Sequence, residues 1–334
     1  MPLLLLLAAS LPVAYAAPVK PAGEVALTGV VEVPLYAGLS GEDAGSYVEA
    51  TVGDKKLLLR VATGHRDLLL SEGALGKLGL KASGKDDEKT AKVESLSIGG
   101  ATFTGVKARV SAPAKSGALA IDGEIGLPGF EGLAFAILPS TGVLRLATGP
   151  DGAALVSGVG AATPANAVWE ERKVKLGDNK VNVRGASLST PVKWSGVELP
   201  AVLAVESSGT WLAREVEGVD WYQVKGGKPV VDLPDAPGAQ VGEARVEWRE
   251  VAVGGVTVPT SVKRVGKGPG TLLEGVVSAQ IGADVLAGLD LAYDPVSGTL
   301  AARPAPTSKR ADYAPAYEAN LRAALEAKPG KDGA

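Results

Sequence analysis

The side chains that could do chemistry in this chain are of few types. Its 334 residues include no cysteine and a single histidine, His65, but 37 aspartates and glutamates. The absence of cysteine excludes disulfides, thiolate catalysis, zinc sites built from Cys and His, and lipid attachment through Cys. Carboxylates therefore remain as the abundant catalytic groups, and the composition predicts no metal and no cofactor.

His65 is the one side chain that ordinarily titrates near neutral pH. Placed beside Ser207 or Ser208, it would form a pair of nucleophile and base, as in many hydrolases. The sequence identifies no acid to orient the imidazole and no oxyanion hole. The alternative interpretation is that His65 is a tolerated substitution without a chemical role.

The charge balance argues against one class of partner. Lys and Arg number 34 against 37 Asp and Glu, which gives a formal net charge of -3. Proteins that bind nucleic acid normally present a strongly basic surface. We therefore expect no nucleic-acid partner.

The first 16 residues, MPLLLLLAASLPVAYA, form an uncharged apolar run that ends in the small-x-small pattern of Ala14, Tyr15 and Ala16. This pattern is typical of a signal peptide, and we expect cleavage before Ala17. The alternative is an uncleaved anchor at the membrane surface. No other stretch approaches ~18 apolar residues, so we expect a mature protein without a membrane span that is exported to the periplasm or secreted.

Short strands are expected to position these residues. The chain contains 44 Gly and 22 Pro but only 4% aromatic residues, and its apolar runs are short and broken by turn residues. This pattern predicts an all-β fold with few short helices. The expected strands of the first half are residues 25–33, 47–52, 56–61, 93–98 and 102–110.

Two patterns recur in the second half of the sequence. A Gly-Gly turn between alternating apolar residues occurs at 94–103 (ESLSIGGATF) and 249–258 (REVAVGGVTV), an offset of 249 − 94 = 155. Residues 125–146 match residues 281–302 at an offset of 281 − 125 = 156, with glycines and a proline in register. Backbone geometry selects glycine and proline, so their recurrence predicts two copies of one β domain.

The repeats divide the chain into expected domains. The signal peptide at 1–16 precedes a first domain at 24–146, a linker at 147–167 and a second domain at 168–303. Residues 304–334 are expected to form a second linker and a C-terminal helix, with Asp312 as a candidate cap and Pro329 at its end. Such a helix would dock on a domain or bind a partner.

Several segments resemble the aspartic peptidases of the pepsin and retropepsin type. The segment at 57–70, LLLRVATGHRDLLL, is similar to the family's first active-site segment, Asp-Thr/Ser-Gly followed by Ser/Thr-x-Asp-Leu. The Gly-Gly turn and DGEIG at 122–126 are similar to motifs that follow it. The second half repeats this order with VESSGTWL at 205–212 and AQIGADVL at 279–286, so the resemblance spans residues 25–303.

The resemblance implies a two-lobed pepsin-like fold, in which a retropepsin-type β-barrel is duplicated so that each lobe is one copy. The chemistry of that family needs one aspartate from each lobe, and the two share a proton so that one acts as base on a water. An alignment on Gly209 identifies the corresponding triplets here as Ala62, Thr63 and Gly64, and Ser207, Ser208 and Gly209. Both acids are absent, as in a pseudoprotease.

Two acids lie near these positions. Asp67 stands where the resemblance implies a structural aspartate. Glu206 precedes Ser207, and if this segment is a strand, its side chain points away from the site because neighbouring side chains alternate. A peptidase that works through Glu206 is an alternative interpretation.

Other residues are candidates for lining a cleft between the lobes. These are His65, Thr210 and Trp211. All five tryptophans lie in the second half, at 169, 194, 211, 221 and 248, either as core residues or as an aromatic groove for a ligand.

The sequence leaves three functions open. The first is an exported, non-catalytic protein of bacterial origin that binds an extended peptide or protein segment between its lobes, or acts as a scaffold. The second is a hydrolase with an altered site, built on His65 with Ser207 or Ser208, or on Glu206. The third is a structural envelope protein, and the oligomeric state is open in each case.

Overall fold

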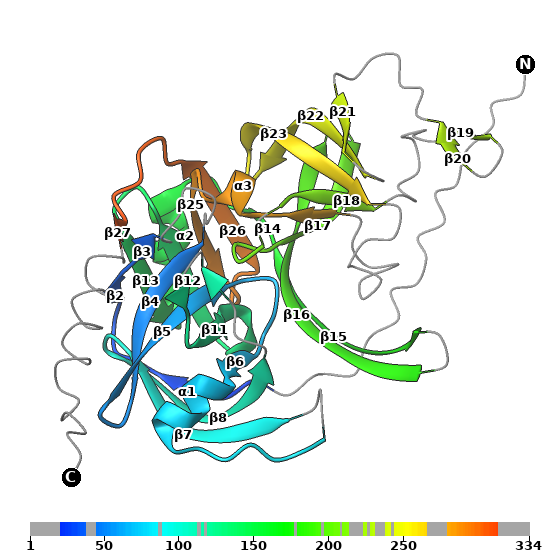
Figure 1. The fold of residues 1–334 in the computed structure, drawn as a ribbon. Coiled ribbons are helices and arrows are strands. Elements are labelled where there is room, and N and C mark those ends of the chain that lie inside the picture. The colour runs from blue at the N-terminus through cyan, green and yellow to red at the C-terminus, as the bar shows by residue number, and fades with distance from the viewer. Residues whose placement is uncertain are drawn as a thin grey trace, which may run out of the picture.

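Most of the described chain in this computed structural model lies in strands (Figure 1). The described residues are 21–37, 45–85, 89–111, 115–116, 119–176, 179–194, 197–207, 209–213, 223–225, 228–230, 238–241, 244–265 and 279–312. The predicted β fold with few short helices is confirmed, and the sheets curve into barrels. The expected signal peptide at 1–16 and the expected C-terminal helix beyond residue 312 lie outside the described residues.

Six strands of the first half close into a ring, which we call the first barrel. Its members are β4 (Ser46–Val52), β5 (Lys55–Ala62), β6 (Leu68–Ser71), β7 (Thr90–Ile98), β8 (Ala101–Ser111) and β11 (Gly123–Gly126). The hydrogen-bonded order runs from β4 through β5, β11, β6, β8 and β7, and it returns to β4 where Thr51 pairs with Ser97. Three short strands extend this sheet, namely β1 (Glu24–Ala26), β3 (Tyr36–Ala37) and β27 (Ala311–Asp312).

Alternating apolar residues form these strands because one side of each strand faces the interior. In the first part of β7, for example, the buried Ala91 and Val93 flank the exposed Lys92. The strand expected at 25–33 is instead two strands, because Gly29 has a φ of 64° and turns the chain between β1 and β2 (Val31–Pro34). β1 then pairs with β8, whereas β2 belongs to a different sheet.

Six strands of the second half form a ring with the same order, the second barrel. Its members are β16 (Asn179–Trp194), β17 (Val197–Leu203), β18 (Trp211–Ala213), β22 (Ala244–Val253), β23 (Val256–Val265) and β24 (Ala279–Ile281). The order runs from β16 through β17, β24, β18, β23 and β22, and it returns to β16 where Lys193 pairs with Ala252. The pairing pattern of the first barrel thus recurs in the second.

Additional strands extend or accompany the second barrel. β15 (Asn166–Leu176) and β16 form the long curved hairpin visible in Figure 1, and β21 (Gly238–Val241) pairs with β22. Two small hairpins stand apart from the large sheets. They consist of β9 (Lys115–Ser116) with β10 (Leu119–Ala120), and β19 (Gln223–Lys225) with β20 (Lys228–Val230).

A six-stranded sheet joins the two halves. In order it contains β14 (Thr163–Pro164), β26 (Thr299–Pro304), β25 (Leu289–Asp294), β12 (Leu133–Leu138), β13 (Val143–Thr148) and β2. At its centre β12 pairs antiparallel with β25, and Ala136 lies opposite Ala292. These two alanines also correspond in the repeat, since 292 − 136 = 156, so a local two-fold axis passes through this pair.

The segment expected to be a linker, at 147–167, contains a helix. α2 (Pro150–Val159) starts with proline at a first-turn position, where the backbone needs no N–H donor. Its residues Leu155, Val156 and Val159 are buried in one cluster with small residues of the shared sheet, including Ala136 and Ala292. The helix therefore covers one face of that sheet.

The other helical segments are short. They are α1 (Glu72–Leu78), α3 (Ala283–Leu286) and the 3-10 turn η2 (Leu127–Gly129). α1 follows β6 and is capped by Ser71, whose Oγ accepts a hydrogen bond from Ala74 N at 3.1 Å. In the part of the chain that the structure describes, no helix combines the length and apolar character needed to cross a bilayer.

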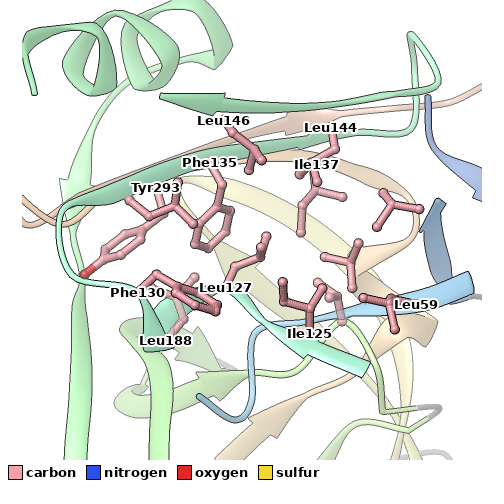
Figure 2. Packing of buried hydrophobic residues seen from close by; sticks show 14 of the residues in the cluster. Leu59, Ile125, Leu127, Phe130, Phe135, Ile137, Leu144, Leu146, Leu188 and Tyr293 are labelled. Atoms are coloured by element: carbon pink, nitrogen blue, oxygen red, sulfur yellow. The ribbon is translucent and has the colours of Figure 1, made fainter. Parts of the chain in front are cut away.

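One hydrophobic core extends through both halves. Buried residues of the first barrel, the shared sheet and the second barrel belong to a single cluster (Figure 2), among them Leu59, Ile125, Phe135, Leu188 and Tyr293. Leu188 lies on β16 of the second barrel and packs in the same region as Phe130, which follows β11 of the first. The halves are therefore held together by apolar packing as well as by the shared sheet.

The chain after β26 returns to the first half. Lys309 N donates a hydrogen bond to the Pro139 carbonyl at 2.8 Å, and β27 then pairs in parallel with β3. Asp312, expected to cap a helix, lies at the end of this strand. The last described residues thus lie beside the first barrel and not beside the second.

Candidate functional site

Two loops, one from each half, are hydrogen-bonded to each other. The first follows β5 and covers residues 63–67, and the second follows β17 and covers residues 204–210; together we call them the junction. The buried Thr63 Oγ1 donates to the Leu203 carbonyl at 2.6 Å and accepts from Val205 N at 3.1 Å. The Thr63 carbonyl accepts a further bond from Leu188 N at 2.9 Å. Thr63, the middle residue of the first predicted triplet, therefore ties the loops together.

Glu206 supplies a second contact across the junction. Its Oε2 accepts from Thr63 N at 3.0 Å, and its Oε1 accepts from Gly64 N at 3.1 Å. A Cβ at Gly64 would lie 2.3 Å from Oε1, so only glycine leaves room for this carboxylate. The expectation that Glu206 points away from the site is wrong, because β17 ends at Leu203 and the alternation of a strand does not extend to residue 206.

The strand register identifies which residues of the two loops correspond. β11 pairs with β5 so that Ile125 lies opposite the residue before Ala62, and β24 pairs with β17 so that Ile281 lies opposite the residue before Ala204. Ile125 and Ile281 correspond in the repeat. Ala62 therefore corresponds to Ala204, at an offset of 204 − 62 = 142.

This register differs from the sequence alignment, in which Ser207 corresponds to Ala62. In the register Ala204 corresponds to Ala62, and Glu206 corresponds to Gly64 because 206 − 64 = 142. The sequence alignment failed because it was anchored on the only glycine of the second loop, whereas the second half has a glutamate where the first has its glycine. Ser207 is instead the counterpart of His65.

His65 and Ser207 each bond to the strand beside their own loop. His65 Nε2 lies 3.1 Å from Glu124 Oε2 on β11, and Ser207 Oγ accepts from Gln280 Nε2 on β24 at 2.7 Å. Glu124 and Gln280 correspond at 280 − 124 = 156, so the two contacts are equivalent in the repeat. The expected pair of His65 and Ser207 does not form, since each side chain is engaged within its own half.

Glycines behind both loops make this geometry possible. A Cβ at Gly126 would lie 2.2 Å from the His65 carbonyl oxygen, and one at Gly282 would lie 2.8 Å from the Ser207 carbonyl oxygen. The loops therefore pack directly on the backbone after β11 and β24. This close approach explains why the glycines recur in register in the two halves.

Charged groups surround His65. Burial alone lowers the pKa of His65, but the hydrogen bond to Glu124 and the charge of Glu206 outweigh it and raise the pKa above 6.5. Burial raises the pKa of Glu124, yet its contact with His65 and its ion pair with Arg60 lower it below 4.5. Both shifts favour the charged forms. His65 Nδ1 is buried and has no hydrogen-bond partner among the described residues.

Asp67 fastens the end of the first loop. Its carboxylate accepts from Arg109 Nη1 on β8 at 3.0 Å and lies 3.6 Å from Arg66 Nε. Its backbone carbonyl accepts from Gly126 N at 3.1 Å. These contacts hold the loop against β8 and β11.

The remaining predicted site residues are not gathered at one surface. Thr210, expected to line a cleft, is buried, and its Oγ1 donates to Asp284 Oδ1 at 2.7 Å at the start of α3. The Gly209 carbonyl accepts from Ser207 Oγ at 3.5 Å. Ser208 lies outside the described residues. The backbone of Trp211 is in β18, but the side chains of the five tryptophans lie outside the described part of the structure.

Several residues in the junction or bonded to it were missed by sequence reasoning. They are Arg60, Glu124, Ala204, Gln280 and Asp284. Glu124 and Gln280 carried a usable signal, since each is a polar residue two positions before the recurring glycine. Ala204 carried no such signal, because nothing in the sequence distinguishes it from the other residues of its apolar run.

These residues determine which chemistry the junction can perform. It holds two carboxylates. Asp67 is paired with Arg109 and Arg66 within the first half, and both oxygens of Glu206 accept backbone amides of the first loop. Within the described ranges, no three His, Cys, Asp or Glu side chains are arranged to hold a metal ion. No protein-family model matches this chain, and no curated protein matches it in sequence.

Proposed function

We propose that this protein is an exported, non-catalytic, two-lobed pepsin-like protein that binds an extended peptide or protein segment between its lobes. In this proposal the first barrel with β12 and β13 makes one lobe, and the second barrel with β25 and β26 makes the other. The shared strand order of the barrels and the two-fold axis of the central sheet support such a duplication.

The observation that carries the proposal is the pair of alanines at Ala62 and Ala204. Peptide hydrolysis by this class of site needs two carboxylates, because one must accept a proton from water while the other remains protonated. The corresponding positions here hold a methyl group each. Glu206 does not replace them, since it is a single acid whose two oxygens are occupied by the amides of Thr63 and Gly64.

Binding remains possible without the acids. An extended segment is recognised largely through backbone hydrogen bonds, and side-chain pockets add selectivity. The hydrogen bonds of Thr63 connect the two loops and do not depend on the acids. We therefore expect association without cleavage.

A peptide-pool experiment tests both parts of this proposal. The protein is incubated with a diverse pool of unstructured peptides at acidic and at neutral pH, and bound and free fractions are analysed by mass spectrometry. We expect a subset of peptides to be retained intact. Specific cleavage that is lost in Glu206→Gln, but not in the exposed control Glu94→Gln, would overturn the non-catalytic assignment.

The proposed export has a separate test. The mass of the protein recovered from the cell envelope or the medium gives its N-terminus directly. We expect the chain to begin at Ala17. A mass that includes residues 1–16 would support the uncleaved membrane anchor instead.

The contact between His65 and Glu124 favours a second candidate, a hydrolase with a histidine base. Glu124 is an orienting acid for the imidazole, which is one component of such a site. A nucleophile beside His65 is the missing component, because Ser207 is bonded to Gln280. Labelling by a serine-directed probe that disappears in both His65→Gln and Ser207→Ala would support this candidate over the first.

A further inference from the structure

Two successive backbone amides in the first loop converge on one carboxylate. Thr63 N lies 3.0 Å from Glu206 Oε2, and Gly64 N lies 3.1 Å from Oε1 and 3.3 Å from Oε2. Consecutive N–H groups that point to the same side form an anion-binding concavity. Hydrogen bonds to an ionised acceptor are about twice as strong as those between neutral groups.

The carboxylate in this concavity comes from the other half of the chain. Glu206 corresponds to Gly64, so the first half has no side chain at the equivalent place. A Cβ on Gly64 would fill the space that the carboxylate now occupies, because it would lie 2.3 Å from Oε1. The first loop thus provides a recess for a carboxylate, and the second loop supplies the occupant.

The charges around Glu206 are of both signs. Arg60 and His65 interact electrostatically with Glu206, and they are balanced by Glu124 and Asp67. Removal of the Glu206 side chain takes away one negative charge and the carboxylate that the buried amide of Thr63 binds. An unpaired buried N–H costs about 1–3 kcal/mol, so the emptied recess would favour another carboxylate.

Glu206 is also accessible. Its side chain is partly exposed, whereas Thr63 behind it is buried. A carboxylate from outside could therefore replace that of Glu206 without unfolding either barrel.

We propose that the amides of Thr63 and Gly64 form a carboxylate-binding site, which the protein's own Glu206 fills until a carboxylate of the bound polypeptide displaces it. The displacing group is either an Asp or Glu side chain or the C-terminal carboxylate of the segment. This inference rests on the proposed peptide-binding function and names the group by which the segment would be anchored.

Acetate is the probe for the recess itself. Glu206→Ala is titrated with sodium acetate against sodium chloride at equal ionic strength, and the Thr63 amide is followed by NMR in protein labelled with ¹⁵N-threonine. We expect a saturable shift of this amide and a saturable rise in thermal stability in Glu206→Ala, and neither effect in the wild type. Equal responses to acetate and chloride would overturn the inference.

Peptides distinguish the two sources of carboxylate and do not require the alanine variant to fold. Each peptide retained from the pool is compared with its C-terminally amidated form and with its Asp/Glu to Asn/Gln form, on the wild type and on Glu206→Gln. We expect one of the two changes to weaken binding about tenfold or more, and more strongly in Glu206→Gln, whose neutral amide holds the recess less tightly. Retained peptides that tolerate both changes in both proteins would overturn the inference and leave peptide binding intact, whereas a pool without any retained peptide would count against the proposed function.

Discussion

At the scale of single residues, His65 gives the junction a pH response of its own. Its pKa in the folded protein is raised above 6.5 by Glu124 and Glu206, although burial opposes the shift. A raised pKa means that the stabilisation is complete below the unfolded value and is lost as the pH rises through the folded value. For Glu124, whose pKa is lowered below 4.5, the stabilisation is lost as the pH falls through its folded value.

We therefore expect the contribution of this pair to the free energy of unfolding to be greatest between pH 4.5 and 6.5. It should fall on the alkaline side as the pH rises through the folded pKa of His65. Urea unfolding over a pH series measures it. His65 is the only histidine, so His65→Gln is the control. In this variant the free energy of unfolding should no longer fall with pH above pH 6.5. A fall that persists would contradict the assignment of this pH dependence to His65.

Gly64 is expected to be intolerant of any side chain. In Gly64→Ala the new Cβ would lie 2.3 Å from Glu206 Oε1 and 2.9 Å from the Ala204 Cβ, so the junction must shift. We expect a loss of about 1–3 kcal/mol in the free energy of unfolding, measured by chemical denaturation. In the double variant with Glu206→Ala the loss should be smaller than the sum of the single losses.

Gly158→Ala is the matched control for this prediction. Gly158 lies in α2 and has open space where a Cβ would be added. Alanine is a better helix former than glycine, so this change should stabilise the protein by about 0.5–1 kcal/mol. Similar losses in both variants would show that the contact with Glu206 is not the cause.

At the scale of elements, the hydroxyl of Thr63 connects the end of β5 to the end of β17. Thr63→Val keeps the shape but leaves the Leu203 carbonyl and the Val205 amide without this partner. We expect a loss of about 2–4 kcal/mol in the free energy of unfolding, because two buried backbone groups become unsatisfied.

Thr63→Ser separates the hydroxyl from the methyl group. This variant keeps the donor and the acceptor and should lose about 1 kcal/mol or less in the same measurement. Equal losses in the valine and serine variants would mean that packing, and not the hydrogen bonds, joins the two elements.

The elements also show how far the sequence can predict the structure. The hairpins β7–β8 and β22–β23 were predicted correctly because a Gly-Gly turn between alternating apolar residues is a local signal. The helix α2 was not predicted, because its Gly and Ala residues are also typical of a linker. Packing against the shared sheet stabilises this segment as a helix. Local patterns therefore locate strands and turns but not the packing that selects a helix.

The junction was predictable in its first half only. The sequence grouped Ala62, Thr63, Gly64 and His65 in one segment, and the structure places them at the end of β5 and the start of the first loop. It misplaced the second loop by three residues, because Glu206 has replaced the glycine that would mark the register. Strand pairing between β17 and β24 restores the register, and such long-range pairing leaves no trace in a single sequence.

At the scale of the whole molecule, the two loops offer a test of the pepsin-like arrangement. The triple variant with Ala62→Asp, Ala204→Asp and Glu206→Gly places two acids at the corresponding positions and restores the missing glycine. We expect it to gain proteolysis with an acidic optimum, because one of the two acids must be protonated. Cleavage of a denatured protein substrate over a pH series measures this gain.

The control for that variant changes the position that the sequence alignment suggested. Ala62→Asp with Ser207→Asp should remain inactive, since residue 207 corresponds to His65 and not to Ala62. Activity in this control, or a folded but inactive triple variant, would speak against the proposed correspondence of the two lobes.

The shared sheet predicts how half of the chain should behave. A fragment of residues 21–160 contains the first barrel, β2, β12, β13 and α2, but it lacks β25, the partner of β12. The native pairing sets Ala136 opposite its counterpart Ala292. Two copies of the fragment can therefore pair through β12 in the same register, with Ala136 opposite Ala136 of the other copy.

We expect this fragment to be dimeric in light scattering after gel filtration. Ala136→Pro removes a ladder donor at the centre of β12 and should prevent dimer formation. Addition of a fragment of residues 161–312 should convert the homodimer to a heterodimer. A folded, monomeric 21–160 fragment would contradict this account of the sheet.

The two central strands of the sheet, β12 and β25, are synthesised at different times. Ala136 and Ala292 are separated by 292 − 136 = 156 residues, which a ribosome adds in on the order of 10–30 s. Throughout that interval one edge of β12 is unpaired. A strand of another nascent chain can then pair with this edge before β25 has been synthesised. Expression level and translation rate should therefore control how much of this protein reaches the native state.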